Sequence, residues 1–360
     1  MFETKRYRFE DVKDFAIRYF SAMDVPEIDA RIAADVLVSA DLRGINSHGV
    51  IRLQSYYGDR LEKGLINPNS PIKTLTETPS TLALDGENGL GPVVAYRAMS
   101  RCIEMADETG IAVTTVRNSN HFGIAGYYAM MALPEDMIGI SLTNSQPLVA
   151  PTFGLSRVLG TNPIAVAVPA GKEKSFVLDM ATSIVPLGKI AVYKKTGQSI
   201  PEGWAIDKDG ALTQDPSEMI NGGALLPLGG PELMRGYKGY GLSMLVDLLS
   251  GVLGGAAFGQ KVGKPGKDGN ADVGHFFAAL KIENFRPVDY FKADMDDYIR
   301  TIKASPKQPG QEQIFIHGEK EDALTEKFMI DGLPLLDEIV QALEKAGQQA
   351  GITFDLDPIE

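Results

Sequence analysis

Ile111-Ala-Val-Thr-Thr-Val-Arg117, continued by Asn118-Ser-Asn-His-Phe-Gly-Ile-Ala-Gly126, is the stretch that decides the fold class. Its first part is short, apolar and rich in β-branched residues, which predicts a strand. Its second part is polar and contains glycine, and it leads into a helical stretch that bears Tyr127 and Tyr128. A strand, a polar turn and a helix in this order are typical of an α/β sheet covered by helices.

The alternation of apolar strands and helices extends on both sides of this stretch. Further strands are predicted over residues 80–85, 137–144, 164–169, 175–180, 275–282 and 314–317. Helices are predicted over 92–108, 186–195, 288–304 and 334–346, and a long apolar helix from residue 237. Two segments lack periodicity, and we predict a polar turn over 203–210 and a mobile loop over 259–274.

The N-terminal segment is predicted to be helical. Amphipathic helices are expected over 9–23 and 26–42, with a third helical stretch over 53–63. The polar loop Arg43-Gly-Ile-Asn-Ser-His-Gly49 lies between the second and the third. The sequence Asn67-Pro-Asn-Ser-Pro71 combines turn formers with two prolines, so we place a subdomain boundary near it.

Composition excludes several classes of protein. The chain has 360 residues, 44% of them hydrophobic and 23% charged, which argues against a disordered chain and leaves room for two domains. A formal net charge of −12 argues against nucleic acid or an anionic membrane as a partner. The single cysteine, Cys102, rules out a disulfide framework, and the charged N-terminus lacks the apolar stretch of a secretory signal. We therefore expect a cytoplasmic protein that binds a small molecule.

The longest apolar stretch, residues 237–258, has to be compared with a membrane span. Only Lys238 and Asp247 carry charge within it. Asp247 would lie near the bilayer centre at a cost of roughly 3 kcal/mol, and the glycines weaken the helix further. The stretch is therefore predicted to be a helix of a protein without a membrane span.

Three of the four histidines stand beside glycine, namely His48, His275 and His317, so we expect their imidazoles to be accessible. His48 shares its loop with Arg52 and Asp41. An imidazole titrates near neutral pH and suits proton transfer, while an arginine can hold a carboxylate by two parallel hydrogen bonds. The alternative is structural, with His48 ending a helix and Arg52 as a solvated charge.

His121 is the second candidate, because it follows a strand and precedes a helix, where the sites of α/β sheets gather. A polar turn with the ring bonded to backbone explains the same residues. If His48 and His121 line one cleft, one of them would hold the substrate while the other passes the proton.

Motifs for metal and phosphate give weaker signals. No His-x-x-x-His or His-Glu-x-x-His spacing occurs, so no metal is predicted. The glycine-rich stretches 86–91 and 236–241 run Gly-x-x-Gly-x-Gly, the reverse of the dinucleotide fingerprint, so a Rossmann fold is not supported. With Lys238, the second stretch would attract an anion at a helix start, or its glycines would allow close helix packing. The polar side chains of Asp179-Met-Ala-Thr-Ser183 would form hydrogen bonds with a nucleotide ribose. Alternatively, Thr182 or Ser183 is simply a helix cap.

Taken together, several segments resemble one family, the type 2 malate/L-lactate dehydrogenases. They occur in the family's order and span nearly the whole chain. These segments are Asp41-Leu-Arg-Gly-Ile-Asn-Ser-His-Gly49 with Arg52, Asn118-Ser-Asn-His-Phe-Gly123, Leu159-Gly-Thr-Asn-Pro163, Asp179-Met-Ala-Thr-Ser183, Gly236-Tyr-Lys-Gly-Tyr-Gly241 and Gly318-Glu-Lys320.

The resemblance implies a non-Rossmann α/β/α layered fold with a mixed sheet, a nicotinamide cofactor, NAD or alternatively NADP, and a homodimer with the cofactor near the subunit boundary. His48 matches the proposed proton donor, Ser47 and Arg52 match its substrate-side neighbours, and His121 matches a histidine with the acid/base role in some members. Further positions match residues that line the cofactor, namely Ser145, Asp179, Met180, Ala181, Thr182, Ser183, Tyr237, Lys238, Gly318, Glu319 and Lys320.

We therefore expect reversible hydride transfer between NAD(P)H and C2 of a small 2-oxo or 2-hydroxy acid, with malate and oxaloacetate favoured over lactate, ureidoglycolate, sulfolactate or a cyclic imine. Residues 1–75 with 321–360 are expected to form a helical subdomain that carries the substrate loop, and 76–320 the cofactor-binding α/β domain. Two rivals remain. One is a cofactor-free lyase or hydrolase using Ser47, His48 and Asp41, and the other is a binding protein without turnover.

Overall fold

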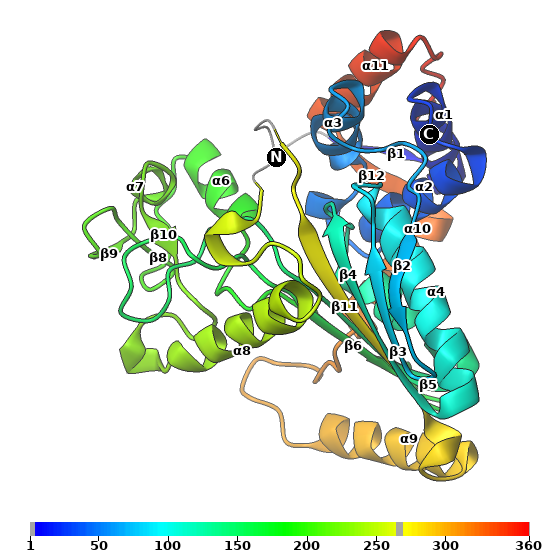
Figure 1. Ribbon diagram of the computed structural model, residues 1–360. Coiled ribbons are helices and arrows are strands. Elements are labelled where there is room, and N and C mark those ends of the chain that lie inside the picture. Colours follow the sequence, from blue (N-terminus) through cyan, green and yellow to red (C-terminus); the bar gives the residue numbers. More distant parts are fainter. Residues whose placement is uncertain (1–3, 264–268, 360) are drawn as a thin grey trace.

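Seven strands form one mixed sheet at the centre of the computed structural model, which describes residues 4–263 and 269–359 (Figure 1). Their order is β2-β3-β4-β11-β5-β6-β7. β3 and β4 are parallel, and every other neighbouring pair is antiparallel. The strands are β2 (Lys73–Glu77), β3 (Thr81–Asp85), β4 (Ile111–Ser119), β5 (Met137–Thr143), β6 (Ile164–Val168), β7 (Phe176–Met180) and β11 (Val273–Lys281).

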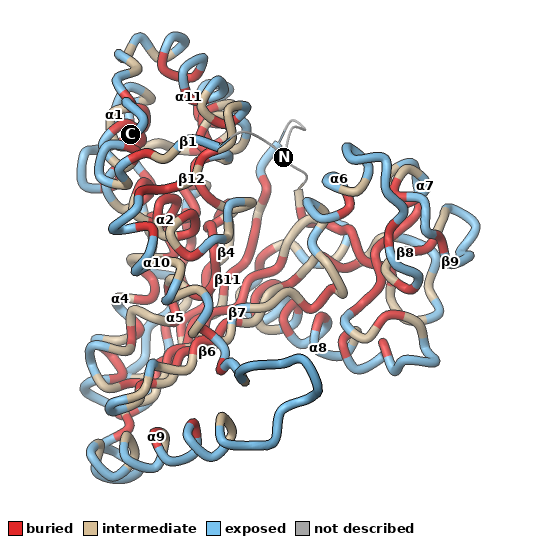
Figure 2. The backbone as a smooth tube through the Cα atoms, turned by 180° about the vertical axis from the view of Figure 1, so that it is seen from behind, coloured by how far each residue is buried: buried red, intermediate tan, exposed pale blue. Residues whose placement is uncertain are grey.

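Helices cover both faces of this sheet. α4 (Gly91–Thr109) and α5 (Ala125–Met130) pack on one face, where small residues of both helices meet the apolar side chains of the strands. α8 (Tyr237–Asp247) continues as a π-helical turn, Leu248–Val252, and lies against β4, β5 and β11 on the opposite face. The central strands β4 and β11 are buried along most of their length (Figure 2). These layers confirm the predicted mixed-sheet α/β fold.

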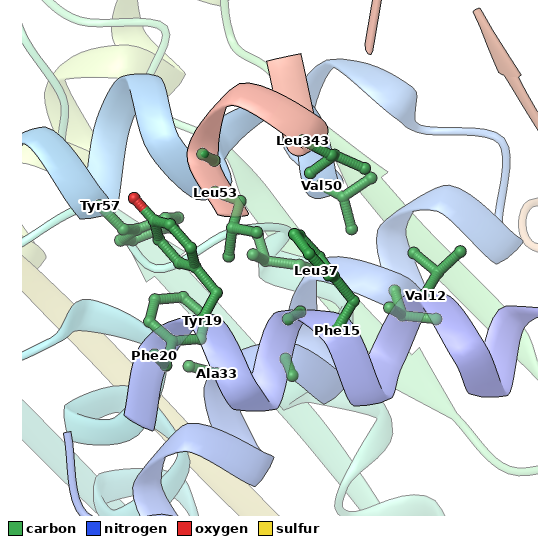
Figure 3. Close-up of a cluster of buried hydrophobic side chains, with 14 of the residues drawn as sticks. Val12, Phe15, Tyr19, Phe20, Ala33, Leu37, Val50, Leu53, Tyr57 and Leu343 are labelled. Carbon is green, nitrogen blue, oxygen red and sulfur yellow. The ribbon is translucent and has the colours of Figure 1, made fainter. Parts of the chain in front are cut away.

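A helical lobe combines both ends of the chain. It contains α1 (Phe9–Ala22), α2 (Glu27–Leu42), α3 (Asp59–Glu62), α10 (Glu319–Asp331) and α11 (Asp337–Ala350). β1 (Thr4–Tyr7) pairs with β12 (Leu333–Leu336) and joins the two ends. The apolar faces of these helices share one cluster of buried side chains, part of which is drawn in Figure 3. Burial of that common face explains why segments so distant in sequence fold together.

A second lobe stands on the other side of the sheet (Figure 1). It contains α6 (Leu187–Lys195), α7 (Pro216–Ile220), β8 (Ala205–Ile206), β9 (Leu212–Thr213) and β10 (Ala224–Leu225), with the strand order β10-β8-β9. Two small apolar clusters of its own hold this lobe together. α9 (Val288–Ala304) completes the fold and follows β11 at the far end of the sheet.

Several local predictions were wrong. Residues 314–317 form no strand. A hydrogen bond from Val177 N to the carbonyl oxygen of His317 joins this segment to β7, but one such bond does not make a strand ladder. Residues 334–336 belong to β12 instead of the predicted helix, since they pair with β1. β1 and β2 were not predicted at all, and β8 lies within the predicted polar turn 203–210.

Two predictions concern the segments around α8. The predicted mobile loop 259–274 falls partly on residues 264–268, which lie outside the described residues; its described part contains a short helical turn, Gly259–Lys261, and the first residues of β11. Within the described ranges 4–263 and 269–359, no helix is both long and apolar enough to cross a membrane. The α-helical part of the apolar stretch ends at Asp247, where the π-helical turn follows.

Candidate active site at one edge of the sheet

Three strands end at the same edge of the sheet. β4 and β5 are each antiparallel to β11, and β6 lies antiparallel between β5 and β7, so β4, β5 and β7 run in the same direction. Their carboxyl ends therefore lie at one edge, where α/β folds place their sites. The candidate residues His121, Ser145 and Asp179 stand at or just after these ends.

The buried carboxylate of Asp41 holds the His48 loop. Its two oxygens accept hydrogen bonds from Val50 N at 2.8 Å and from Asn46 Nδ2 at 3.1 Å. The loop passes so close that a Cβ at Gly49 would lie 2.0 Å from Asp41 Oδ1, which explains the glycine. Burial raises the pKa of Asp41 to about 7 in spite of both donors.

This arrangement bears on the hydrolase alternative. Ser47 Oγ lies 2.9 Å from His48 Nδ1, but among the described residues the partners of the Asp41 carboxylate are Val50 and Asn46, not His48. The orienting bond from acid to imidazole that a nucleophilic triad needs is therefore not formed. The cap of α2 is Arg43 and that of the short helical turn Asn46–His48 is Gly49, so His48 is not the helix cap of the structural alternative.

The structure brings His48 and His121 together. Their rings are stacked with centroids 5.4 Å apart and planes inclined by 19°. Tyr56 adds its ring at 4.7 Å from His121, and the hydroxyl of Tyr57 lies 2.9 Å from His121 Nδ1. The two histidines, 73 positions apart in sequence, thus form one aromatic cluster at the surface of the helical lobe.

Both imidazoles are held neutral. Burial, followed by the nearby positive charge of Arg52, lowers the pKa of His48 to about 4. Burial also lowers the pKa of His121 well below its ordinary value, and the positive charge of Arg52 acts in the same direction, as a proton on His48 or His275 would. A neutral imidazole is the form that accepts a proton.

Arg52 supplies the cation of this cluster. Its Nε donates to the carbonyl oxygen of Ser47 at 2.7 Å, and its guanidinium lies 5.8 Å from the centroid of the Tyr56 ring. The side chain is therefore held and partly buried rather than solvated. Its terminal nitrogens have no hydrogen-bond partner among residues 4–263 and 269–359, so the fork that binds a carboxylate bidentately is available.

His275 contradicts the expectation that it is accessible. The residue is fully buried on β11, where Nε2 meets Ser119 Oγ and Nδ1 meets Thr143 Oγ1, each at 2.8 Å. Its ring also stacks on Phe122 with centroids 4.6 Å apart. His275 thus links β4, β11 and β5 directly beneath the His121 loop, and glycine as a neighbour did not indicate exposure. His317, by contrast, is exposed.

A cavity of about 270 Å³ opens next to both histidine loops. Its lining includes Arg43 from the loop before His48, Gly126 from the start of α5, Asp179, Gly318 and Lys320. The cavity therefore brings together three of the residues expected at the cofactor. Glu319 is directed away, because its carboxylate pairs with Lys303 at 2.6 Å and accepts from Ile316 N.

Both charge signs are present in this cavity. Asp179 accepts a hydrogen bond from Gly126 N at 2.7 Å, and the surrounding protein raises its pKa to about 6. Lys320 lies 4.4 Å from the centroid of the Phe315 ring, with its ammonium group at the cavity. Arg43 pairs with Asp322 at 2.8 Å. The lining of the cavity thus includes both a hydrogen-bond acceptor and cations.

The side chains of several other residues expected at the cofactor form hydrogen bonds within the protein. Thr182 Oγ1 donates to the carbonyl oxygens of Thr161 and Asn162, and Ser183 Oγ donates to that of Val185. Neither caps a helix, because α6 begins only at Leu187. Ser145 Oγ accepts from Thr161 N and meets the hydroxyl of the same threonine. Met180 and Ala181 are half-buried between these groups.

Tyr237 and Lys238 do not line this cavity. Both are exposed at the start of α8, and Tyr237 keeps 44% of its surface accessible. The glycines around them allow close packing, since a Cβ at Gly239 would lie 2.2 Å from the carbonyl oxygen of Leu228. The structure therefore separates these two residues from the histidines and from Asp179 in the single chain.

Sequence reasoning missed three residues of the site. Tyr56 and Tyr57 come from a π-helical segment, Leu53–Gly58. The helix predicted over 53–63 did not indicate that these two side chains belong to the site. Arg43 was recognised as part of the polar loop but not as a cavity residue. In the described part of the chain, no group of three or more His, Cys, Asp or Glu side chains is placed to hold a metal ion.

Known proteins resemble this chain over nearly its whole length. Residues 7–344 match the family described as malate/L-lactate dehydrogenase. A malate dehydrogenase of Pyrococcus abyssi is 50% identical over 95% of this chain and 94% of that protein. An L-sulfolactate dehydrogenase of Methanocaldococcus jannaschii is 41% identical over 96% of this chain and 97% of that protein. The solved malate dehydrogenase of Pyrococcus horikoshii superposes with a TM-score of 0.90 at 46% identity, over 98% of this chain and 99% of that one. The protein therefore belongs to the malate/L-lactate dehydrogenase family.

Proposed function

We propose that this protein transfers hydride reversibly between a nicotinamide cofactor and C2 of a small 2-oxo or 2-hydroxy acid, with malate and oxaloacetate as the favoured pair. Family membership makes the chain an oxidoreductase that acts on a CH–OH group. The observation that carries the proposal is the stacked pair His48 and His121 near Arg52, whose terminal nitrogens have no hydrogen-bond partner in the described part of the chain. The named relatives at 50% identity support malate as the substrate.

The residues of the cavity fit part of a dinucleotide. A carboxylate such as Asp179 accepts hydrogen bonds from ribose hydroxyls, and cations such as Lys320 attract phosphate. The bound nicotinamide supplies or receives the hydride. We favour NAD over NADP, because an added ribose phosphate would meet the negative charge of Asp179 while Arg43 is already paired with Asp322.

Arg52 would bind the substrate carboxylate and so fix the position of C2. In reduction, His48 would give a proton to the carbonyl oxygen as C2 receives hydride; in oxidation, neutral His48 would take the hydroxyl proton. A carboxylate on Arg52 offsets the positive charge that lowers the pKa of His48, so the anionic substrate itself favours the protonated ring. In the ligand-free site the neutral His48 ring is the form that accepts the hydroxyl proton of a 2-hydroxy acid.

We also propose a homodimer formed through α8. Large apolar side chains line one face of this helix and its π-helical continuation: Tyr237, Met244, Leu245, Leu248 and Val252, each between 40% and 50% exposed. A continuous apolar stripe of this kind is typical of a surface covered by a partner. A second copy there would also bury the surroundings of Lys238, a residue expected at the cofactor.

The division into a helical subdomain, 1–75 with 321–360, and a cofactor-binding domain, 76–320, stays part of this proposal. The apolar cluster shared by both chain ends supports it. A cytoplasmic location is proposed on the single cysteine, Cys102, which is buried and unpaired, as expected in a reducing compartment.

The test is a panel of reactions followed by nicotinamide absorbance. The purified protein is mixed with NADH or NADPH, and oxaloacetate, pyruvate, sulfopyruvate, a glyoxylate-like acid and a cyclic imine are added one at a time. Loss of absorbance with oxaloacetate and NADH is the expected result. A faster loss of absorbance with another acceptor would show that this acceptor, and not oxaloacetate, is the preferred substrate. Absence of any reaction together with absence of NADH binding would reject the proposed dehydrogenase activity.

A further inference from the structure

Tyr57 lies against His121 and has no part in the reaction described above. It is fully buried in the helical cluster, next to Leu53, Tyr19 and Phe20 (Figure 3). It comes from the π-helical segment Leu53–Gly58, a rare local structure that is frequent at functional sites. Its hydroxyl lies 2.9 Å from His121 Nδ1 and 3.3 Å from the His121 carbonyl oxygen.

A second group meets the same ring nitrogen. The backbone N–H of Gly123 donates to His121 Nδ1 at 3.3 Å. The backbone reaches this position because Gly123 has a φ of +84°, and a Cβ there would lie 2.5 Å from Val36 Cγ1. A glycine is therefore required for the amide to turn back onto the ring.

The Tyr57 hydroxyl and the Gly123 amide differ in which tautomer of His121 each of them permits. The Tyr57 hydroxyl alone would allow either tautomer of His121, because a hydroxyl both donates and accepts. The Gly123 amide can only donate, so Nδ1 must present its lone pair and the hydrogen of the neutral ring must be on Nε2. With Nδ1 as an acceptor, the phenol can give its one hydrogen to Nδ1 at 2.9 Å, the shorter contact, rather than to the His121 carbonyl oxygen at 3.3 Å, so both partners of Nδ1 are donors.

His48 has no such restriction. Among the described residues, its Nδ1 meets only the hydroxyl of Ser47, at 2.9 Å. That hydroxyl can donate to a bare nitrogen or accept from a protonated one, so His48 can gain or lose a proton without breaking the bond. A proton on His121 Nδ1 would instead face the hydrogen of Gly123 N.

We propose that Tyr57 is a positioning residue which, with the Gly123 amide, holds His121 as the neutral Nε2–H tautomer. His121 then donates a hydrogen bond to the substrate oxygen on C2, and His48 alone moves the proton. This inference rests on the proposed function and assigns the two histidines different tasks in it. A neutral donor next to a carbonyl oxygen stabilises the negative charge that develops there as hydride arrives.

The charges around His121 agree with a neutral ring. His48, Arg52 and His275 face it from three different elements; burial and the cation of Arg52 lower its pKa, and a proton on His48 or His275 would lower it further. Among the residues that the structure describes, Tyr56 and Tyr57 are the other titratable groups in contact with the ring. Burial raises the pKa of both phenols, so both keep their hydrogens and neither adds negative charge.

The first experiment is NMR of the ligand-free protein labelled with isotopic nitrogen in its histidines, with the His121 signals assigned from a His121→Gln variant. The expected result near neutral pH is a single neutral tautomer with hydrogen on Nε2. An Nδ1–H tautomer or a charged ring would overturn the proposal. In Tyr57→Phe, which keeps the ring and removes one donor, the Gly123 amide still requires the hydrogen on Nε2, but the Nδ1 signal should move toward that of a less hydrogen-bonded nitrogen; an unchanged Nδ1 signal would reject the role of Tyr57.

The second experiment compares turnover. His121→Gln retains an N–H donor near the position of Nε2, so its kcat should fall by about tenfold or less, the usual value of one hydrogen bond, with an unchanged pH profile. The kcat of His48→Gln should fall by a factor of roughly 10²–10⁴. Equal losses in the two variants would contradict the division of tasks.

Tyr19→Phe is the matched control, because it removes a buried phenol hydroxyl from the same cluster that makes no hydrogen bond to His121 within the described chain. Tyr57→Phe should lower kcat by roughly 2–10-fold and leave the acid KM unchanged, whereas Tyr19→Phe should change neither. Equal effects of the two would mean that only packing was lost. If the tautomer is as proposed but no 2-oxo acid is reduced, the inference about Tyr57 stands and the proposed function fails.

Discussion

Two parts of the site differ in how far one chain completes their hydrogen bonds. The histidine half, formed by His48, Arg52, Tyr57 and His121, has its rings stacked and its inner nitrogens bonded. The other half, which we name the cofactor half because we propose that it binds the cofactor, consists of Asp179, Tyr237, Lys238, Gly318 and Lys320 and is split between an open cavity and an exposed helix.

The difference follows from what surrounds each half. The histidine half rests on the apolar cluster of the helical lobe and on the buried edge of the sheet, so its side chains are locked before any ligand arrives. The proposed cofactor half faces solvent in the single chain, and in our proposal a ligand and a second copy complete it. Preorganisation of the reacting groups raises the rate, while an open cofactor side permits exchange.

The largest effect should come from replacing the proton carrier. His48→Ala removes the ring that gains and loses the proton, so turnover should fall by roughly 10²–10⁴. Binding of NADH, measured by fluorescence titration, should stay the same because His48 does not line the cavity. Near-normal turnover in this variant would assign the proton transfer to His121 instead of His48, and it would contradict the different roles of the two histidines.

A smaller effect is expected at Arg52. Arg52→Gln loses charge-assisted hydrogen bonds of about 1.5–3 kcal/mol, so the KM of the 2-oxo acid should rise roughly 10–100-fold. Removal of the nearby cation should also raise the pKa of His48, so that the fall of the reduction rate with rising pH starts at higher pH. Lys320→Gln is the control, and it should change the KM of the cofactor instead. A reversed pattern would mean that the two halves have been assigned the wrong ligands.

The third prediction concerns the cofactor half. Leu248→Asp places a charge in the apolar stripe of α8 and should convert a dimer to a monomer in analytical ultracentrifugation. If a second copy completes this half, NADH binding should weaken by about tenfold or more, since the surroundings of Lys238 are lost. Ile28→Asp, on the exposed face of α2, is the control and should change neither. A monomer that binds NADH normally would show that the single chain suffices.

The smallest effect is expected beneath the histidine half, at His275. Burial lowers the pKa of His275 to about 3, so between pH 6.5 and that value the unfolded chain binds the proton and the folded chain does not. The stability from this group is complete above pH 6.5 and is lost as the pH falls.

In His275→Gln this acid-dependent loss should be smaller than in the wild type, while the stability near neutral pH should fall by about 1–2 kcal/mol through lost hydrogen bonds to Ser119 and Thr143. Urea unfolding at several pH values measures both quantities. The exposed His317→Gln serves as the control. An equally steep acid loss in both variants would place the pH-sensitive group elsewhere.

Much of the fold was predictable because it is encoded locally. The strand Ile111–Ser119, its polar turn and the helices on either side follow from apolar periodicity and turn residues, which act over a few positions. The same holds for the amphipathic helices α1 and α2. β2 escaped prediction because all of its residues are exposed and it lacks the alternation of a half-buried strand.

The sequence by itself determined which residues are suited to the chemistry. A histidine with an arginine four positions later, and a second histidine after a strand, were identified from residue type and spacing. The family resemblance rests on these same motifs, and the profile match to residues 7–344 confirmed it.

Only the tertiary structure decided how these residues act on one another. Insertion of β11 between β4 and β5 sets the sheet edge at which the loops meet, and it buries His275, whose glycine neighbour had indicated exposure. The stacking of His48 on His121, and the two donors on one nitrogen of His121, arise between segments far apart in sequence. Tautomer, charge and burial depend on the atoms within a few ångströms, and only the folded chain brings those atoms together.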